Sequence, residues 1–192
     1  MKQRTLRSLA ALTVCCIVVL PVSALEFPRT FPSTGTIEYA FTPGGEAADL
    51  IARTIDAART QVLVQAYSFT HRGIAHALVR AHRRGLDVQV IADHEQIAGF
   101  ESAAMRDLIE AGVPVFTDAE HAAAHNKVII VDHESNQSAV ITGSFNFTFA
   151  AQNRNAENVL VLRGNPALAS AFFANWQQHR EHAVAMARGN NK

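Results

Sequence analysis

Hydrophobic and polar positions follow two different periods along the first half of the chain. Apolar residues recur at every second position in some short runs and at helical spacing in the segments between them. These patterns predict strands at 36–42, 62–68, 87–92 and 113–117, and helices at 46–59, 71–84 and 101–111. Gly85 and Gly112 follow two of the helices as C-cap signals. Because strands and helices alternate, we expect these strands to be largely parallel.

The second half of the chain has a different order of elements. Two apolar runs, 127–131 and 139–141, are separated by a polar stretch and predict a hairpin. We expect a short helix or turn at 147–152, a strand at 158–162, and a terminal helix at 166–187 whose buried side carries Leu168, Phe172, Phe173 and Trp176. The expected fold class is α/β, with a mixed central β-sheet, helices on both faces and one domain over residues 36–188.

The N-terminal residues have the pattern of a secretory signal peptide. A basic start is followed by an apolar run at 9–20, Pro21 and a small-residue triplet, which predicts a signal at 1–24 cleaved after about Ala24. A permanent membrane anchor is the alternative, but the run is short and Pro21 interrupts it. We therefore expect an exported protein, periplasmic or secreted, with a leader segment at 25–35 and no stable membrane insertion after cleavage.

Removal of this signal changes the charge of the chain. The whole sequence has 17 basic and 17 acidic residues, and loss of Lys2, Arg4 and Arg7 leaves 14 against 17, a net charge of −3 with histidine neutral. This excludes a protein that holds nucleic acid by overall positive charge, so any nucleic acid would be bound at a local site. Lys127 is the one lysine in the body of the fold.

The segment around Lys127 has residues suited to phosphate chemistry. His125 and Lys127 lie two apart at the start of an apolar strand and therefore share one face. An imidazole can act as nucleophile or proton carrier, and a neighbouring ammonium can hold a phosphate oxygen. Asp132 lies seven positions after His125, on the opposite face of a regular strand, and we expect a structural partner such as an arginine for it.

Two further segments carry polar groups beside apolar strands. Gly143 permits a sharp turn or a close backbone approach, and Ser144 and Asn146 are small donors two apart that can face the same oxygens. Glu157 stands at the start of the strand at 158–162 and could hydrogen-bond one imidazole nitrogen, which would fix the tautomer.

The combination H-x-K-x4-D followed by G-S-x-N resembles the signature of the phospholipase D superfamily. The single motif in a short exported chain is similar to the Nuc-type bacterial endonucleases, and residues 65–70, 88–93 and 155–158 share the likeness. It covers roughly Tyr39 to Trp176. The resemblance implies a phospholipase D-like fold with one HKD motif per chain.

The resemblance also implies roles for the site residues. His125 is expected to form a phosphohistidine, Lys127, Ser144 and Asn146 to bind the phosphate, Glu157 to orient the histidine, and Asp132 to support the site. Because family members need two motifs per active site, the implied assembly is a homodimer with one shared site. Neither a metal ion nor another cofactor is expected at that site.

Three functions remain open at this point. The first is an endonuclease acting on DNA, and on RNA as a further possibility. The second is a lipid phosphodiesterase acting on a phospholipid such as cardiolipin, because fold and motif do not choose the alcohol on phosphorus. The third is a non-catalytic nucleic-acid-binding module. The Nuc-like flanking segments favour the first, the negative charge weakens that preference, and the intact polar set argues against the third.

The other histidines are expected to be surface or capping residues: His71, His76, His82, His94, His121, His133, His179 and His182. A zinc site on His121 and His125 is the alternative for that pair. The chain has no H-E-x-x-H pattern, and His125 is expected to begin a strand, so we do not favour it. Thr148 is expected to cap the following turn rather than touch substrate.

Overall fold

The computed structural model describes residues 28–97 and 102–186. The chain divides into two compact units, residues 1–30 and 31–192, and all the helices and strands described below belong to the second. The expected signal peptide lies outside the described residues, as do positions 187 and 188 of the expected domain. Residues 31–35 of the expected leader are part of the second unit, where the Thr34 hydroxyl donates to the carbonyl of Gly164 at 3.1 Å.

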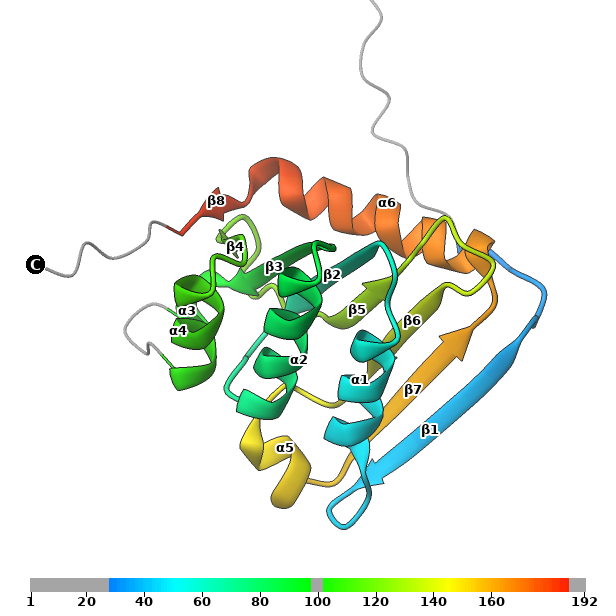
Figure 1. Cartoon of the computed structure of the whole chain (residues 1–192), viewed down its shortest axis with the longest axis horizontal. Coiled ribbons are helices and arrows are strands. Elements are labelled where there is room, and N and C mark those ends of the chain that lie inside the picture. Colours follow the sequence, from blue (N-terminus) through cyan, green and yellow to red (C-terminus); the bar gives the residue numbers. More distant parts are fainter. Residues whose placement is uncertain (1–27, 98–101, 187–192) are drawn as a thin grey trace, which may run out of the picture. The chain divides into compact units, whose positions relative to one another are not determined.

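One mixed sheet forms the centre of the described structure (Figure 1). Its strands are β1 (Thr36–Thr42), β2 (Gln61–Ala66), β3 (Asp87–Asp93), β4 (Val115–Asp118), β5 (Lys127–Val131), β6 (Ala139–Gly143), β7 (Glu157–Arg163) and β8 (Val184–Ala185). Their order across the sheet is β1-β7-β6-β5-β2-β3-β4-β8. Strands β2, β3 and β4 are parallel, and the other neighbours are antiparallel. The predicted mixed sheet and the predicted hairpin, β5–β6, are confirmed.

Helices cover both faces of this sheet, as predicted. They are α1 (Ala47–Asp56), α2 (Arg72–Arg83), α3 (His94–Ile97), α4 (Ala103–Glu110), α5 (Phe149–Asn153) and α6 (Pro166–His182). Side chains of a strand alternate between faces, so Val62 and Val64 pack in the larger core with α1, α2 and α4. Leu63 points the other way and packs with Trp176 of α6. The helices therefore anchor the central strands from both sides.

Helix ends follow local sequence signals. His71 and Ser102 accept hydrogen bonds from the backbone N–H three residues later at the starts of α2 and α4. The Thr148 hydroxyl accepts from the N–H of Ala151 at 3.1 Å, which confirms the predicted cap. Gly85 has φ of 88°, a conformation that glycine adopts readily after a helix.

The terminal helix is shorter than predicted. It ends at His182, and Ala183 is extended, so that the chain turns into β8 and pairs with the edge of β4. The N–H of Met186 also donates to the carbonyl of Val115. The helical pattern continues past His182, but pairing with an open sheet edge satisfies the backbone there instead. This places the C-terminal end of α6 beside β4.

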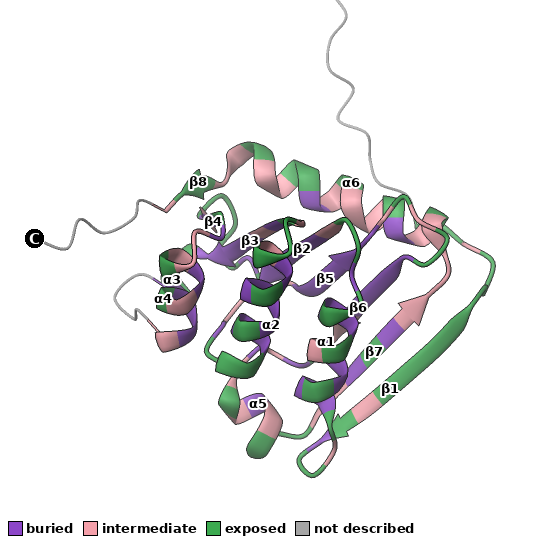
Figure 2. Cartoon of the chain, viewed as in Figure 1, coloured by how far each residue is buried: buried purple, intermediate pink, exposed green. Residues whose placement is uncertain are grey.

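Strand β1 does not lie beside the parallel strands. It pairs antiparallel with β7 at the opposite edge of the sheet. Figure 2 shows that β1 is largely exposed while the central strands are buried. One side of the edge carries exposed apolar side chains, which we call the β1 patch: Ile37, Tyr39, Phe41 and, on the paired residue of β7, Leu160. An apolar patch of this kind is typical of a surface that contacts a partner.

Candidate active site

His125 and Lys127 lie together at the start of β5. The Nζ of Lys127 is 2.9 Å from Nδ1 of His125 and donates to the His125 carbonyl at 2.6 Å. Lys127 is buried, with 9% of its surface exposed, whereas His125 is exposed. The predicted pair is thus in contact, and the exposed imidazole is open to a reactant while the lysine beside it is buried.

The burial of Lys127 affects its charge. Loss of water around the ammonium lowers the pKa of Lys127, and the nearby Glu157 carboxylate opposes part of this shift. A partly desolvated cation interacts more strongly with a phosphate oxygen than a fully hydrated one does. The environment of Lys127 is therefore suited to binding a phosphodiester.

Tyr67 is a member of the site that the sequence did not single out as functional. Its ring centroid is 4.2 Å from that of His125, and the Lys127 Nζ lies 5.0 Å from the same ring. The N–H of Tyr67 donates to the carbonyl of Asn126, which continues the pairing between β2 and β5. An aromatic residue directly after β2 was the available signal, but only the strand register shows which residue it faces.

The strand register brings the other predicted segments to the same end of the sheet. Ile129 of β5 pairs with Ile141 of β6, and continuing this register places Gly143 opposite Lys127. Gly143 pairs in turn with Val159, two residues after Glu157. The starts of β5 and β7 and the end of β6 therefore lie side by side.

Gly143 allows a close approach that other residues could not make. Its φ is 151°, and a Cβ at this position would lie 2.3 Å from the carbonyl oxygen of Asn158. That carbonyl accepts from the N–H groups of Ser144 and Phe145. The turn after β6 is thus held against the start of β7, as the motif glycine predicted.

Buried phenylalanines orient the polar residues of this turn. Phe145 and Phe147 are buried, and Phe147 accepts backbone hydrogen bonds from Thr70 and His71. The Ser144 hydroxyl accepts from the backbone and side-chain N–H groups of Asn158 at 3.0 and 3.3 Å. The alternation of apolar and polar positions, two apart, turns Ser144 away from the core.

Asn146 carries an unsatisfied polar atom. Among the residues that the structure describes, its Oδ1 is buried and has no hydrogen-bond partner. Buried polar atoms are nearly always paired, so an orphaned oxygen needs a reason. A group supplied by a ligand or by a second chain would satisfy it, which agrees with the phosphate-binding position expected for Asn146.

Glu157 lies near the pair but does not make the expected contact. Its Oε1 accepts from Nδ2 of Asn155 at 3.0 Å, and its charge acts on Lys127. The Nδ1 of His125 faces Lys127 instead. The expected hydrogen bond between Glu157 and the imidazole is therefore replaced by an electrostatic contact with the lysine.

Asp132 is not part of this group. It follows the other end of β5, about 17 Å from Lys127 at about 3.3 Å per residue. Its carboxylate accepts from the backbone N–H groups of Arg59, Thr60 and Gln61 at 2.8–2.9 Å. The partner is thus the backbone before β2 rather than an arginine side chain. The expectation that Asp132 supports the site is corrected, because it fixes the segment before β2 at the other end of the strand.

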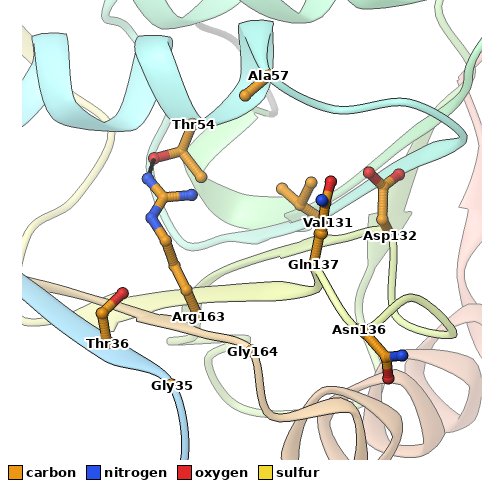
Figure 3. A pocket seen from close by; sticks show the side chains of 10 residues that line it. All are labelled: Gly35, Thr36, Thr54, Ala57, Val131, Asp132, Asn136, Gln137, Arg163 and Gly164. Atoms are coloured by element: carbon orange, nitrogen blue, oxygen red, sulfur yellow. Dashed lines mark hydrogen bonds between the residues drawn. The ribbon is translucent and has the colours of Figure 1, made fainter.

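A hollow of about 300 Å³ lies at this far end of the strands (Figure 3). Asp132 and Arg163 line it, but both are already engaged. The Arg163 guanidinium donates to Glu38 and to the Thr54 hydroxyl. With its charged groups satisfied and the histidine–lysine pair at the opposite end, this hollow is not the candidate site.

Three histidines expected at the surface or at caps gather elsewhere. His121, His179 and His182 surround Asp118, and their ligand atoms lie within 4.8 Å of one another and of an Asp118 oxygen. His121 therefore lies against the histidines of α6, and not with His125 as the alternative zinc pair would require. No sequence motif marks this group, because its members come from β4, the following loop and the distant α6.

The family of this chain follows from the match of its sequence to a protein-family model. Residues 51–180 match the family described as "Cardiolipin synthase, PLD-like domain". The chain belongs to the phospholipase D superfamily and is a phosphodiesterase of that superfamily. This confirms the resemblance seen in the HKD motif.

Relatives and solved structures agree with this assignment. A phospholipase D of Rickettsia conorii is 37% identical over 144 residues, which is 75% of this chain and 69% of the relative. The human mitochondrial cardiolipin hydrolase is 32% identical over 62% of this chain and 46% of its own length. The phospholipase D family member Nuc from Salmonella typhimurium is 39% identical with a TM-score of 0.74, over 79% of this chain and 97% of Nuc.

Proposed function

We propose that this protein is a metal-independent endonuclease that hydrolyses DNA through a phosphohistidine at a site shared by two copies of the chain. The observation that carries the proposal is the exposed imidazole of His125 with a buried ammonium 2.9 Å from its Nδ1. Such a pair supplies a nucleophile or proton donor together with a fixed positive charge. RNA is a further candidate substrate. The signal-like N-terminus supports action after export, in the periplasm or outside the cell.

The two histidines of a dimer would have different protonation states. One His125 would be the imidazolium, which donates its Nε2 proton and becomes a neutral imidazole. The partner's imidazole would carry its proton on Nδ1 and attack phosphorus through Nε2. The P–N bond forms as the P–O bond to the leaving alcohol breaks, and the first histidine protonates that oxygen. It then removes a proton from water, whose oxygen displaces the phosphohistidine.

The β1 patch supports the dimer. Each chain has one HKD histidine, so the two-histidine mechanism needs a second copy. The patch includes Phe41, which pairs with Asn158, and Asn158 donates to the Ser144 hydroxyl at the site. An apolar surface continuous with an incomplete site suits contact between two copies about a two-fold axis.

A lipid phosphodiesterase is the second candidate. The names of the Rickettsia and mitochondrial relatives favour it, and the net charge of −3 that remains without Lys2, Arg4 and Arg7 gives no preference for DNA. No helix in the described part is both long and apolar enough to span a bilayer. The endonuclease is preferred because the match to Nuc extends over nearly all of that chain, together with the Nuc-like flanking segments.

One assay separates the candidates. The purified protein, His125→Asn and the control His82→Ala are incubated with supercoiled plasmid, and separately with cardiolipin vesicles, with and without excess chelator. An endonuclease nicks the plasmid under chelation, His125→Asn loses at least about 10³-fold of the rate, and His82→Ala does not. Release of phosphatidic acid without nicking supports the lipid enzyme, and nicking by His125→Asn contradicts the mechanism.

The shared site is tested by changing the β1 patch. Tyr39→Glu places a charge in the apolar surface and is expected to shift the protein to monomers in analytical ultracentrifugation and to reduce the rate. An exposed change elsewhere, Arg83→Glu, is the control. Full activity from a protein that sediments as a monomer at the assay concentration excludes the shared site.

A further inference from the structure

A histidine cluster lies around Asp118, outside the candidate active site. Asp118 is the last residue of β4, and His121 follows three positions later in the loop. His179 and His182 are three apart at the C-terminal end of α6, so they share one face of the helix. In Figure 1 this end of α6 and β8 lie beside β4, in agreement with the β4–β8 pairing.

The distances place four ligand atoms around one point. The Nδ1 of His179 and the Nε2 of His182 lie 2.6 and 3.2 Å from Oδ2 of Asp118. The Nδ1 of His121 lies 3.6 Å from Oδ1. All four ligand atoms fall within 4.8 Å of one another. With metal–ligand bonds of about 2.0–2.1 Å, the ligands of a tetrahedral zinc ion lie about 3.4 Å apart, so small side-chain rotations suffice.

The protein alone does not satisfy this cluster. The Asp118 side chain is fully buried, a position that a carboxylate occupies only with strong partners. His182 Nε2 is close to it, yet that nitrogen is buried without a hydrogen bond in the described structure. The three rings also contact one another, with centroids 4.9–5.5 Å apart. Several imidazoles packed together, one with an orphaned nitrogen, need a group that accepts their lone pairs.

We propose that Asp118, His121, His179 and His182 bind one divalent transition-metal ion of the zinc class. Three imidazoles and one carboxylate form a complete tetrahedral set, which is typical of a structural rather than a catalytic zinc site. Imidazole ligands favour zinc over magnesium or calcium, which prefer oxygen. The exposed His121, with 49% of its side chain accessible, gives the ion a path from solvent.

The bound ion has a structural consequence. It ties the C-terminal end of α6 to β4 and fixes the loop that leads from Asp118 to His125. The same loop is held by Asp93, whose carboxylate accepts from the N–H of Ala124 at 2.8 Å. The metal site therefore stabilises the fold and the loop before the catalytic histidine, while the ion itself takes no part in the phosphodiester chemistry.

Metal binding is tested on protein purified without a polyhistidine tag. Mass-spectrometric metal analysis after dialysis against Zn²⁺ is expected to give one ion per chain. Zn²⁺, but not Mg²⁺, is expected to raise Tm by roughly 5 °C or more. Co²⁺ is expected to give the visible absorption of a tetrahedral complex. The double variant His179→Ala/His182→Ala loses all three signals.

The control is His76→Ala. His76 pairs with Asp107 at 3.0 Å on the surface of α2, so it removes another histidine–aspartate contact without touching the cluster. It is expected to behave as the unmodified protein. Circular dichroism reports whether the double variant is folded. If it is not, His121→Gln in the exposed loop replaces it and is expected to weaken Zn²⁺ binding at least about 10-fold.

Two results overturn the inference. One is folded protein that retains no zinc and shows no Tm shift. The other is zinc retained at the same stoichiometry and affinity by folded cluster variants. Because the readouts are metal content and thermal stability, neither result depends on whether the protein cleaves DNA, lipid or neither.

Discussion

The His125–Lys127 pair and the histidine cluster around Asp118 differ in the surroundings of their buried charged group. At the start of β5, burial lowers the pKa of the Lys127 ammonium, and Glu157 opposes only part of the shift. At the end of β4, burial acts to raise the pKa of Asp118, but the hydrogen bond from His179 and the electrostatic interaction with His182 outweigh it and lower the pKa to about 2. The Lys127 cation has few partners, whereas the Asp118 anion is surrounded by imidazoles.

The difference separates the roles of the two centres. The positive charge of Lys127 is available to stabilise an incoming phosphate, and the adjacent imidazole is exposed. The carboxylate at Asp118 is closed off by imidazoles and is suited to hold a cation in place. A histidine alone therefore does not distinguish the candidate reacting centre from the other site, and we base the proposed assignment on the charged group beside it.

The largest effect is expected from Lys127→Met. Removing the ammonium while keeping an aliphatic chain is expected to reduce phosphodiesterase activity by about 10²–10³-fold, because the positive charge facing the phosphate is lost. Lys127→Arg is expected to restore little, since a planar guanidinium does not fit a buried point-charge position. Initial rates with a soluble phosphodiester measure both. Unchanged rates in Lys127→Met would remove the basis for assigning the reaction to this centre.

Next is Gly143→Ala, which tests the backbone of the reacting centre. The new Cβ would lie 2.3 Å from the Asn158 carbonyl oxygen, so the turn must shift and displace Ser144 and Asn146. We expect a loss of about 2–4 kcal/mol in the free energy of unfolding and a reduced rate. Urea denaturation and rates below the new Tm measure these. Gly44→Ala is the control, because Gly44 also has a positive φ, 92°, but a Cβ there meets nothing within 4 Å.

Asp132→Asn is expected to affect stability rather than chemistry. The carboxylate accepts hydrogen bonds from three backbone N–H groups. The substitution is expected to lower the free energy of unfolding by about 2 kcal/mol at neutral pH, with little change in rate. Burial raises the pKa of Asp132, but these hydrogen bonds outweigh it and lower the pKa below 3.8. The contribution is therefore complete above about pH 4 and is lost as the pH falls through the lowered value. Denaturation at several pH values measures the difference in the free energy of unfolding between the unmodified protein and Asp132→Asn. This difference is expected to become smaller in acid, and a difference that grows in acid contradicts the assignment.

The smallest effect is expected from the aromatic neighbour of the pair. Tyr67→Phe keeps the ring against His125 and below Lys127, so activity is expected to stay within about threefold. Tyr67→Ala removes the ring and is expected to reduce activity about tenfold. Equal rates for both variants would mean that the ring does not position the imidazole.

The fold could be predicted to a large extent because its elements have clear local patterns. Strand and helix positions, the hairpin and the caps at Thr148 and Gly85 follow from residues close in sequence. The exceptions are the place of β1, which pairs with β7 at the far edge, and the end of α6 at His182. Both depend on which sheet edge is open, and no local pattern carries that information.

The sequence by itself determined the contact of His125 with Lys127 and the turn at Gly143, because residues two apart on a strand must share a face. Only the tertiary structure decided that the Asp132 carboxylate accepts hydrogen bonds from the backbone before β2, and that Glu157 acts on the lysine. It also decided that Asp118 contacts histidines 61 and 64 positions away in the sequence. The physical reason is that local periodicity fixes the side on which a residue lies. Which distant residue it meets depends on strand order, register and the length of a helix.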